Sequence, residues 1–260
     1  MVNDGSIHFN KKRYLSEYNN LHIISYRKNK RIIRKFNKNK FNFEEIFFNH
    51  FKKFELNNLE DAHNNLPAEY LPNKVVEVTN DQAQKIYEFL YKIDEGFNLQ
   101  KKTNSSNFLK LFDNFVLFLA KEIFKESLVY QARPTLRIMF PNNKAVGDFH
   151  RDREYNHPIE EINIWVPITS SNDTNTICIE SSFDKNDYSP MNLKYGEFLI
   201  FDSGLKHGNK INLENKTRIS FDFRIIPETI WQNKKIKKTK FSADSKMEFD
   251  IGGYYKLMKI

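Results

Sequence analysis

The second half of the chain consists of short β-rich runs separated by turn residues, and this pattern limits the fold more than any other feature. From Tyr130 onward, runs of β-branched and aromatic residues alternate with Pro, Gly, Asn and Asp. The predicted strands are residues 135–140, 161–169, 176–180, 197–201 and 217–226. Such strands, with no helical pattern between them, favour an all-β sandwich or barrel over βαβ units. We therefore predict a mainly β fold, a jelly roll with flanking helices.

Helices are predicted in the first half. The segment that begins at Thr79 has the form of a capping box and continues with apolar residues at helical spacing. A second helix, over residues 106–127, has an apolar stripe wide enough to lie against a sheet, and a third is predicted over 43–54. We predict that residues 1–70 form a basic N-terminal extension packed on the core, and that residues 71–260 form the β domain with its buttressing helices.

Positive charge is concentrated outside the middle of the chain. The formal net charge is +8, and Lys and Arg cluster over residues 27–53 and 234–240. Such clusters can bind a polyanion, or they can simply be solvated. No zinc-finger or RNA-binding motif accompanies them in the sequence, and the aromatic residues interleaved with the first cluster resemble one packed helical face. A nucleic-acid partner is therefore not expected.

The sequence also indicates a compartment. Cys178 is the one cysteine, so no intrachain disulfide can form, which is typical of a reducing compartment. No apolar run approaches the roughly 18–20 residues of a membrane span. Residues 1–10 lack the pattern of a secretory signal. We expect a cytoplasmic protein without a membrane span; the sequence does not indicate its oligomeric state.

His150-x-Asp152, at the end of a β-like run, is the strongest candidate for a chemical site. Two residues separated by one position on extended backbone point to the same side, so an imidazole and a carboxylate can bind one metal ion together. His207 follows another predicted strand and can supply a third ligand. Two histidines and one carboxylate on one face of Fe(II) leave positions open for a chelating cosubstrate and O2.

A candidate cosubstrate clamp follows on the next predicted strand. Arg218, Ser220, Asp222 and Arg224 alternate with apolar residues there and form a polar face, which is costly in a sandwich interior unless it lines a site. Arg218 can hold a carboxylate through two hydrogen bonds, and the Ser220 hydroxyl can add one more. This pair suits the far carboxylate of 2-oxoglutarate.

Other polar residues near these motifs are candidates for substrate binding or for the rim of the site. Arg137 and Asn163 interrupt apolar runs, although a structural hydrogen bond would explain each of them equally well. His157 precedes Pro158 and is assigned to a loop at the rim rather than to the metal. The candidate substrate residues are Arg137, Arg151, Arg153, Tyr155, His157 and Asn163.

The combination of His-x-Asp, His-Gly and Arg-x-Ser resembles the Fe(II)/2-oxoglutarate-dependent dioxygenase superfamily. Residues 131–227 look like its phytanoyl-type branch. Four segments, RPTLR from Arg133, FHRDREYNHP from Phe149, EINIWVP from Glu161, and Asn175-Thr176, are similar to oxygenases of bacterial carbohydrate and aminoglycoside biosynthesis clusters. The resemblance implies a double-stranded β-helix (cupin-like) core, Fe(II) held by His150, Asp152 and His207, 2-oxoglutarate as cosubstrate held by Arg218 with Ser220, and O2 as the oxidant.

Two details refine the predicted reaction. Glu180-Ser181-Ser182 stands where many relatives have a Pro-Gly-Ser-His turn, so this loop is expected to differ in shape. Asp152 is intact, whereas halogenases of the superfamily lack the carboxylate, so hydroxylation or a related oxidation is favoured. The predicted substrate is a polar small molecule such as a sugar or nucleotide-sugar. The alternatives are a non-redox jelly-roll protein that binds or isomerises carbohydrate, and an oxygenase that acts on a polyanionic macromolecule.

Overall fold

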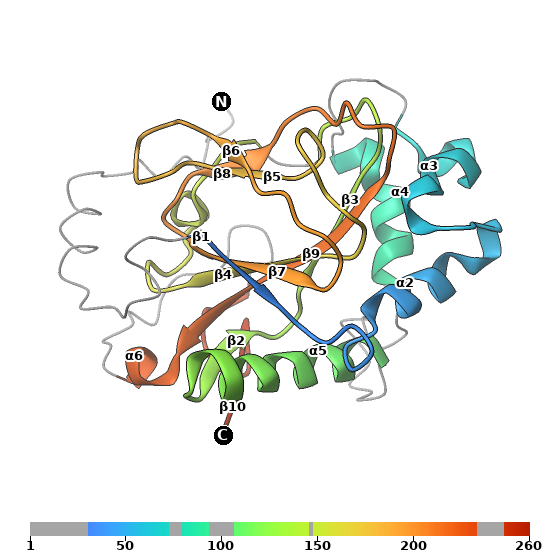
Figure 1. Ribbon diagram of the computed structural model, residues 1–260. Coiled ribbons are helices and arrows are strands. Elements are labelled where there is room, and N and C mark those ends of the chain that lie inside the picture. The colour runs from blue at the N-terminus through green and yellow to red at the C-terminus, as the bar shows by residue number, and fades with distance from the viewer. Residues whose placement is uncertain (1–30, 73–79, 94–106, 146–147, 233–246) are drawn as a thin grey trace, which may run out of the picture.

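Two antiparallel sheets form the centre of the molecule. The computed structural model describes residues 31–72, 80–93, 107–145, 148–232 and 247–260. The larger sheet has seven strands in the order β1-β7-β4-β9-β2-β10, with β3 also paired to β9, and the smaller has the order β6-β5-β8 (Figure 1). The strands are β1 (Arg31–Lys35), β2 (Leu128–Gln131), β3 (Thr135–Met139), β4 (Ile162–Pro167), β5 (Ile177–Ile179), β6 (Ser189–Pro190), β7 (Glu197–Asp202), β8 (His207–Asn209), β9 (Arg218–Pro227) and β10 (Tyr255–Met258).

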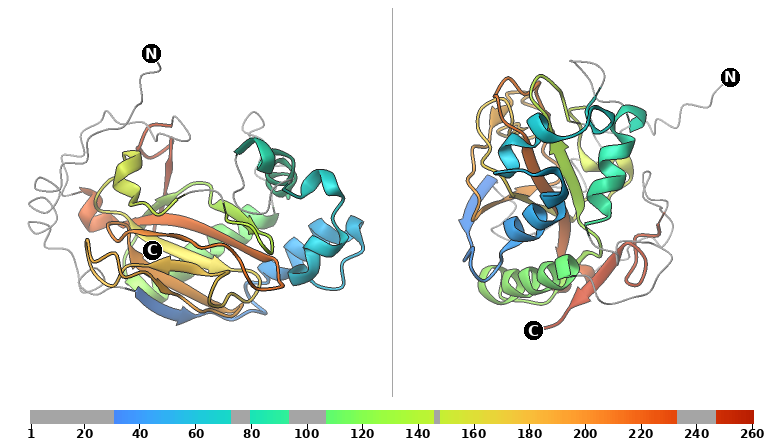
Figure 2. Two further views of the ribbon diagram at one scale, coloured as in Figure 1. Left: turned by 90° about the horizontal axis from the view of Figure 1, so that it is seen from above. Right: turned by 90° about the vertical axis from the view of Figure 1, so that its right-hand side faces the viewer.

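Helices cover one face and one end of the larger sheet. The α-helices are α2 (Phe43–Phe51), α3 (Ala62–Asn65), α4 (Asn80–Tyr91), α5 (Asn107–Phe118) and α6 (Glu228–Gln232). A π-helical turn, Leu119–Phe124, extends α5, and short 3-10 turns lie at Lys52–Phe54, Leu59–Asp61, Ala68–Tyr70 and Asp152–Tyr155. Figure 1 shows α5 along the face of the sheet opposite the small sheet, and Figure 2 shows α2, α3 and α4 gathered at one end.

Strand β9 separates the core from the candidate site. Ile219, Phe221 and Phe223 pack into the largest hydrophobic cluster, where Phe112 of α5 contacts the Phe223 ring edge-on with centroids 4.8 Å apart. Arg218 and Arg224 lie on the other face of the strand and line a cavity. The period-two alternation of the sequence therefore has the predicted effect, since one side of β9 is buried against helices and the other faces the site.

The predicted fold class is confirmed: the fold is mainly β with flanking helices around a double-stranded β-helix core. All five predicted strands are present with ends shifted by at most two residues. The strands β1, β2, β6, β8 and β10 are not predicted, because each has only two to five residues and none shows a strong alternation. The Thr79 cap and the 234–240 cluster lie outside the described residues.

The N-terminal basic segment takes part in the core. Strand β1 pairs with β7, and the rings of Phe36, Phe43 and Phe47 are buried in the main hydrophobic cluster. The aromatic residues among the lysines are thus a packed face, as predicted. The division at residue 70 stays a prediction. None of the helices in the described ranges is long and apolar enough to cross a membrane.

A conservative truncation in this core tests the packing. Ile200 on β7 is 1% exposed, and removing one methylene with Ile200→Val should lower the free energy of unfolding by about 0.5–1.5 kcal/mol. Ile33 on β1 is 39% exposed, so Ile33→Val should change it by less than about 0.5 kcal/mol. Urea denaturation of both variants measures the difference; equal effects would contradict the assigned burial.

Candidate metal centre

The two histidines come from separate segments that are joined by a short antiparallel bridge. The backbone N–H of His150 donates to the carbonyl of His207, and that of His207 donates to the carbonyl of His150, both at 2.9 Å. Their rings lie 4.7 Å apart, centroid to centroid. Gly208 makes this approach possible, because a Cβ there would lie 2.9 Å from the Cα of Phe149. The His-Gly pair of the sequence therefore has a packing reason.

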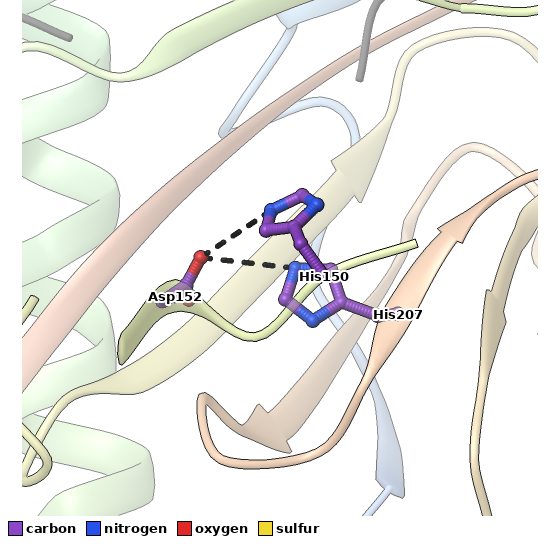
Figure 3. A group of neighbouring side chains, drawn as sticks. All are labelled: His150, Asp152 and His207. Carbon is purple, nitrogen blue, oxygen red and sulfur yellow. Dashed lines mark ion pairs between the residues drawn. The ribbon is translucent and has the colours of Figure 1, made fainter. Parts of the chain in front are cut away.

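Asp152 completes a cluster of three side chains. It begins a 3-10 turn two residues after His150, and its Oδ1 lies 3.8 Å from the Nε2 atoms of both His150 and His207. One ligand atom from each residue can be chosen so that all three lie within 4.8 Å of one another. Figure 3 shows the carboxylate facing both imidazoles. The structure thus brings the three predicted ligands together, with separations that allow a single ion to bind all three.

Backbone carbonyls set the orientation of both rings. The Nδ1 of His150 lies 2.6 Å from the carbonyl oxygen of Asp148, and the Nδ1 of His207 lies 2.9 Å from that of Leu205. A carbonyl accepts only, so each Nδ1 carries the proton in these bonds and each Nε2 keeps a free lone pair. Such a bond is what fixes the tautomer of a metal-binding histidine.

Burial and charge fix the protonation states of the cluster. Burial acts to raise the pKa of Asp152, but the guanidinium of Arg224 together with the neighbouring histidines outweighs it and holds that pKa well below the usual range. Burial lowers the pKa of His207 to about 4, although Asp152 acts to raise it. Near pH 7 the site therefore offers an ionised carboxylate and a neutral His207, which are the forms that bind metal ions.

Two further side chains hold the Asp152 carboxylate. Asn163 of β4 donates to Oδ2 at 2.6 Å, and Arg224 of β9 donates to Oδ1 at 3.0 Å. These two residues are direct cross-strand partners in the sheet. Asn163, which the sequence suggests as a substrate residue, lines the cavity as well as binding this carboxylate, and its role toward a substrate stays a prediction. The alternation of β9 places Arg224 on the polar face, but it does not predict the contact with Asp152.

The cluster lies beside a cavity that is continuous with solvent. Its wall includes charged residues and the aromatic rings of Trp165 and Phe201. The lining residues are Arg137, His150, Asn163, Trp165, Ile177, Phe201, His207, Gly208, Asn209, Arg218, Asp222 and Arg224. The side chain of His150 is 20% exposed, whereas that of Asp152 is 1% exposed. Solvent therefore reaches the three-residue cluster past His150.

Arg218 is a buried cation in this wall. Its guanidinium donates to the hydroxyl of Ser220 at 3.0 Å and to the side-chain oxygen of Asn209 at 3.1 Å, and it lies 5.8 Å from the centre of the Trp165 ring. The Nε of Arg218 has no hydrogen-bond partner among the described residues. Burial lowers the pKa of Arg218 to about 10, so the group stays charged near pH 7.

Arg137 also lines the cavity, but it is paired. Its Nε donates to Asp222 at 3.1 Å, and Asp222 also accepts from Arg224 at 3.3 Å. Burial acts to lower the pKa of Arg137, but the carboxylate of Asp222 raises it above the ordinary value. Arg137, Asp222, Arg224 and Asp152 thus form a chain of alternating charge that ends at the histidines.

Arg151 does not line the cavity. It is buried, donates to Glu180 at 2.9 Å and to the carbonyl of Gly204 at 3.1 Å, and lies over the ring of Phe183. Glu180 also accepts from the backbone N–H of Lys206 at 2.7 Å. Glu180, from the segment predicted to differ in shape, therefore ties together the residues next to both histidines.

The other predicted substrate residues lie behind or beside the cluster. His157 is buried, contacts Glu161 through Nδ1 at 2.8 Å and packs against Phe249, so it does not form an exposed rim. Arg153 donates to the carbonyl of His157 at 3.2 Å. Tyr155 places its ring edge-on to His150 with centroids 5.0 Å apart. Tyr155 therefore contacts the predicted ligand His150 through its ring, and His157 contacts the predicted ligand Asp152 through its backbone N–H, which donates to the Asp152 carbonyl at 3.3 Å.

Comparison with known proteins gives one curated relative and several partly similar structures. The chain is 33% identical over 131 residues to the streptomycin biosynthesis protein StrG of Streptomyces griseus. The match covers 50% of this chain and 60% of StrG, so the chain spans less than two thirds of that relative. No family model matches the sequence.

The match to StrG supports the resemblance predicted from the motifs. The four segments that resemble oxygenases of carbohydrate and aminoglycoside biosynthesis clusters agree with the match to a streptomycin biosynthesis protein. Among solved structures, the non-heme alpha-ketoglutarate-dependent epimerase SnoN from nogalamycin biosynthesis is 11% identical with a TM-score of 0.42, covering 58% of this chain and 72% of SnoN. CytC3 with Fe(II) and alpha-ketoglutarate is 14% identical with a TM-score of 0.41, covering 70% of this chain and 85% of CytC3.

Proposed function

We propose that the chain is an Fe(II)/2-oxoglutarate-dependent oxygenase that hydroxylates or otherwise oxidises a C–H bond of a polar small molecule. The observation that carries this proposal is the convergence of His150, Asp152 and His207, with ligand atoms within 4.8 Å, beside a cavity that the two histidines line. In this proposal the three residues hold Fe(II) through the two Nε2 atoms and one carboxylate oxygen. This ligand set suits Fe(II) oxygenases because it leaves adjacent positions open.

The wall of the cavity fits an anionic cosubstrate as well. Arg218 is 1% exposed, and among the described residues no carboxylate forms an ion pair with it. A buried charge without a counterion is costly, so an anion bound there would be stabilised. The unpartnered Nε marks unused hydrogen-bonding capacity. In this proposal Arg218 and Ser220 bind the far carboxylate of 2-oxoglutarate.

The iron with 2-oxoglutarate and O2 would supply the oxidising chemistry, and the chain would supply position and surroundings. Asn163 and Arg224 hold the carboxylate of Asp152 in one orientation. Backbone carbonyls orient both imidazoles. The rings of Trp165 and Phe201 give part of the wall an apolar surface, which limits water around the reacting groups.

We propose a sugar or nucleotide-sugar as the substrate class. The similarity to a protein of streptomycin biosynthesis supports a carbohydrate-like natural product, and a cavity with both aromatic and polar walls suits such a molecule. The polyanionic-macromolecule alternative depends on the basic segments, and in the described part of the first segment the aromatic residues belong to the core. The non-redox alternative predicts neither iron binding nor succinate formation.

Anaerobic titration of the wild-type protein with Fe(II) and then 2-oxoglutarate tests the proposal. A weak visible charge-transfer band should grow as 2-oxoglutarate is added, because the keto acid chelates the metal. At saturating 2-oxoglutarate, the band should reach its maximum at one equivalent of Fe(II) per protein chain. Omitting Fe(II), or replacing 2-oxoglutarate with succinate, should give no band. If the protein binds no iron, or if iron and 2-oxoglutarate together give no band, the proposed function is wrong.

A further inference from the structure

The carboxylate of Asp152 is held by a charged group and a neutral one. Arg224 donates to Oδ1, the oxygen that faces both histidines, and Asn163 donates to Oδ2. A carboxylate has about four lone-pair positions, two on each oxygen. On Oδ1, Arg224 occupies one lone-pair position, and the other, toward the histidines, is left for a metal. The amide of Asn163 binds Oδ2 and so fixes the orientation of the carboxylate.

The positive charge of Arg224 is buried and fixed. Its side chain is 9% exposed, and Gln131 and Asp222 hold its other terminal nitrogen at 3.2 and 3.3 Å. Asp222 is also paired with Arg137, so it does not belong to Arg224 alone. The four-residue chain from Arg137 to Asp152 contains two cations and two anions. Without a metal, Arg224 therefore acts as the counterion of Asp152.

A bound metal changes this balance. The metal takes over much of the charge of Asp152, and the guanidinium then remains beside a cation in a poorly solvated site. Coulomb repulsion grows in proportion to the metal charge, so a fixed positive neighbour opposes a trivalent ion more than a divalent one. Charges and hydrogen bonds around the ligands of a metal alter its redox potential.

We propose that Arg224 is a positioning residue that also acts electrostatically, because it holds Oδ1 of Asp152 toward the histidines and favours ferrous over ferric iron at this site. The inference rests on the proposed function, since it concerns the same metal. Arg224 lies outside the predicted ligand set, and it is one of the two side chains that hold Asp152, the other being Asn163. Asn163 supplies orientation without charge, whereas Arg224 supplies orientation and charge.

An anaerobic redox titration of the iron-loaded full chain, with mediator dyes and no 2-oxoglutarate, tests this role. Each iron gives up one electron to the mediator as it becomes ferric. In Arg224→Gln the midpoint potential should fall relative to wild type, because the charge is lost. In Arg224→Lys the charge is kept and the potential should stay close to that of wild type. Equal midpoint potentials for Arg224→Gln and wild type would overturn the proposal. A midpoint potential that falls as far in Arg224→Lys as in Arg224→Gln would also overturn it.

Asn163→Ala is the matched variant on the other carboxylate oxygen. It should weaken Fe(II) binding by about 10–100-fold, the usual cost of removing a group that orients a ligand, with little change in potential. If the potential falls as much in Asn163→Ala as in Arg224→Gln, the effect is one of orientation and the electrostatic role is wrong.

A second charge variant covers the case in which Arg224→Gln does not fold. Arg137 is more exposed, with 28% of its side chain accessible, and Arg137→Gln leaves Asp222 to Arg224 alone. The potential should then fall in the same direction but by less, and an unchanged potential would overturn the proposal. Failure of the proposed function looks different, because the wild type itself would then hold no iron or give no band with 2-oxoglutarate.

Discussion

Replacing His207 with alanine is expected to abolish the visible band that the wild type gives with Fe(II) and 2-oxoglutarate in the absence of oxygen. The change removes one of three protein ligands, an imidazole whose Nε2 lies 3.8 Å from Oδ1 of Asp152. Loss of a group that merely orients a ligand costs about 10–100-fold in metal affinity, so loss of the ligand itself should cost at least as much. His150→Ala is expected to behave in the same way.

His157→Gln is the control for this experiment. His157 is the other histidine near the cluster, but its Nδ1 contacts Glu161 and its ring packs against Phe249. We expect the band to persist in this variant, with far-UV circular dichroism confirming the fold of each protein. A band that survives in His207→Ala would contradict the ligand assignment, and a band lost only in His157→Gln would transfer the third ligand to residue 157.

The clustering of the three candidate metal ligands could be predicted from the sequence because local rules place them. Two residues on alternate positions share a side, which joins His150 to Asp152. His207 begins β8, five residues after the end of β7, so these strands position it. The bridge between residues 150 and 207 then brings His207 next to His150 and Asp152. The polar face of β9 was predictable for the same reason, since alternation on a buried strand fixes which side chains face the site.

The groups that hold the ligands could not be predicted, because long-range pairings decide them. Arg224 reaches Asp152 across 72 residues of sequence, and Tyr255 of β10 donates to the buried Glu161 across 94. Strand register sets both contacts, and the sequence alone does not fix register between distant strands. Arg151 shows the same limit: its position beside the ligands suggests substrate binding, whereas its contact with Glu180 depends on a distant loop.

Arg218→Ala should keep the iron and lose much of the affinity for 2-oxoglutarate. The guanidinium is separate from the three metal ligands, and its described partners are Ser220, Asn209 and Met139. Removing a charged hydrogen-bond donor typically costs about 1.5–3 kcal/mol, which corresponds to roughly a 10–150-fold increase in the dissociation constant of 2-oxoglutarate. The dependence of the charge-transfer band on 2-oxoglutarate concentration, at saturating Fe(II), measures this constant directly.

Arg218→Lys separates charge from geometry. A lysine keeps the positive charge but presents a point charge in place of the planar fork that matches a carboxylate. Its affinity should therefore lie between those of wild type and Arg218→Ala. An unchanged affinity in Arg218→Ala would show that 2-oxoglutarate binds elsewhere, whereas simultaneous loss of iron would show that Arg218 supports the metal. The predicted result, iron kept and cosubstrate weakened, follows only if the buried cation and the three-residue cluster bind opposite ends of the same molecule.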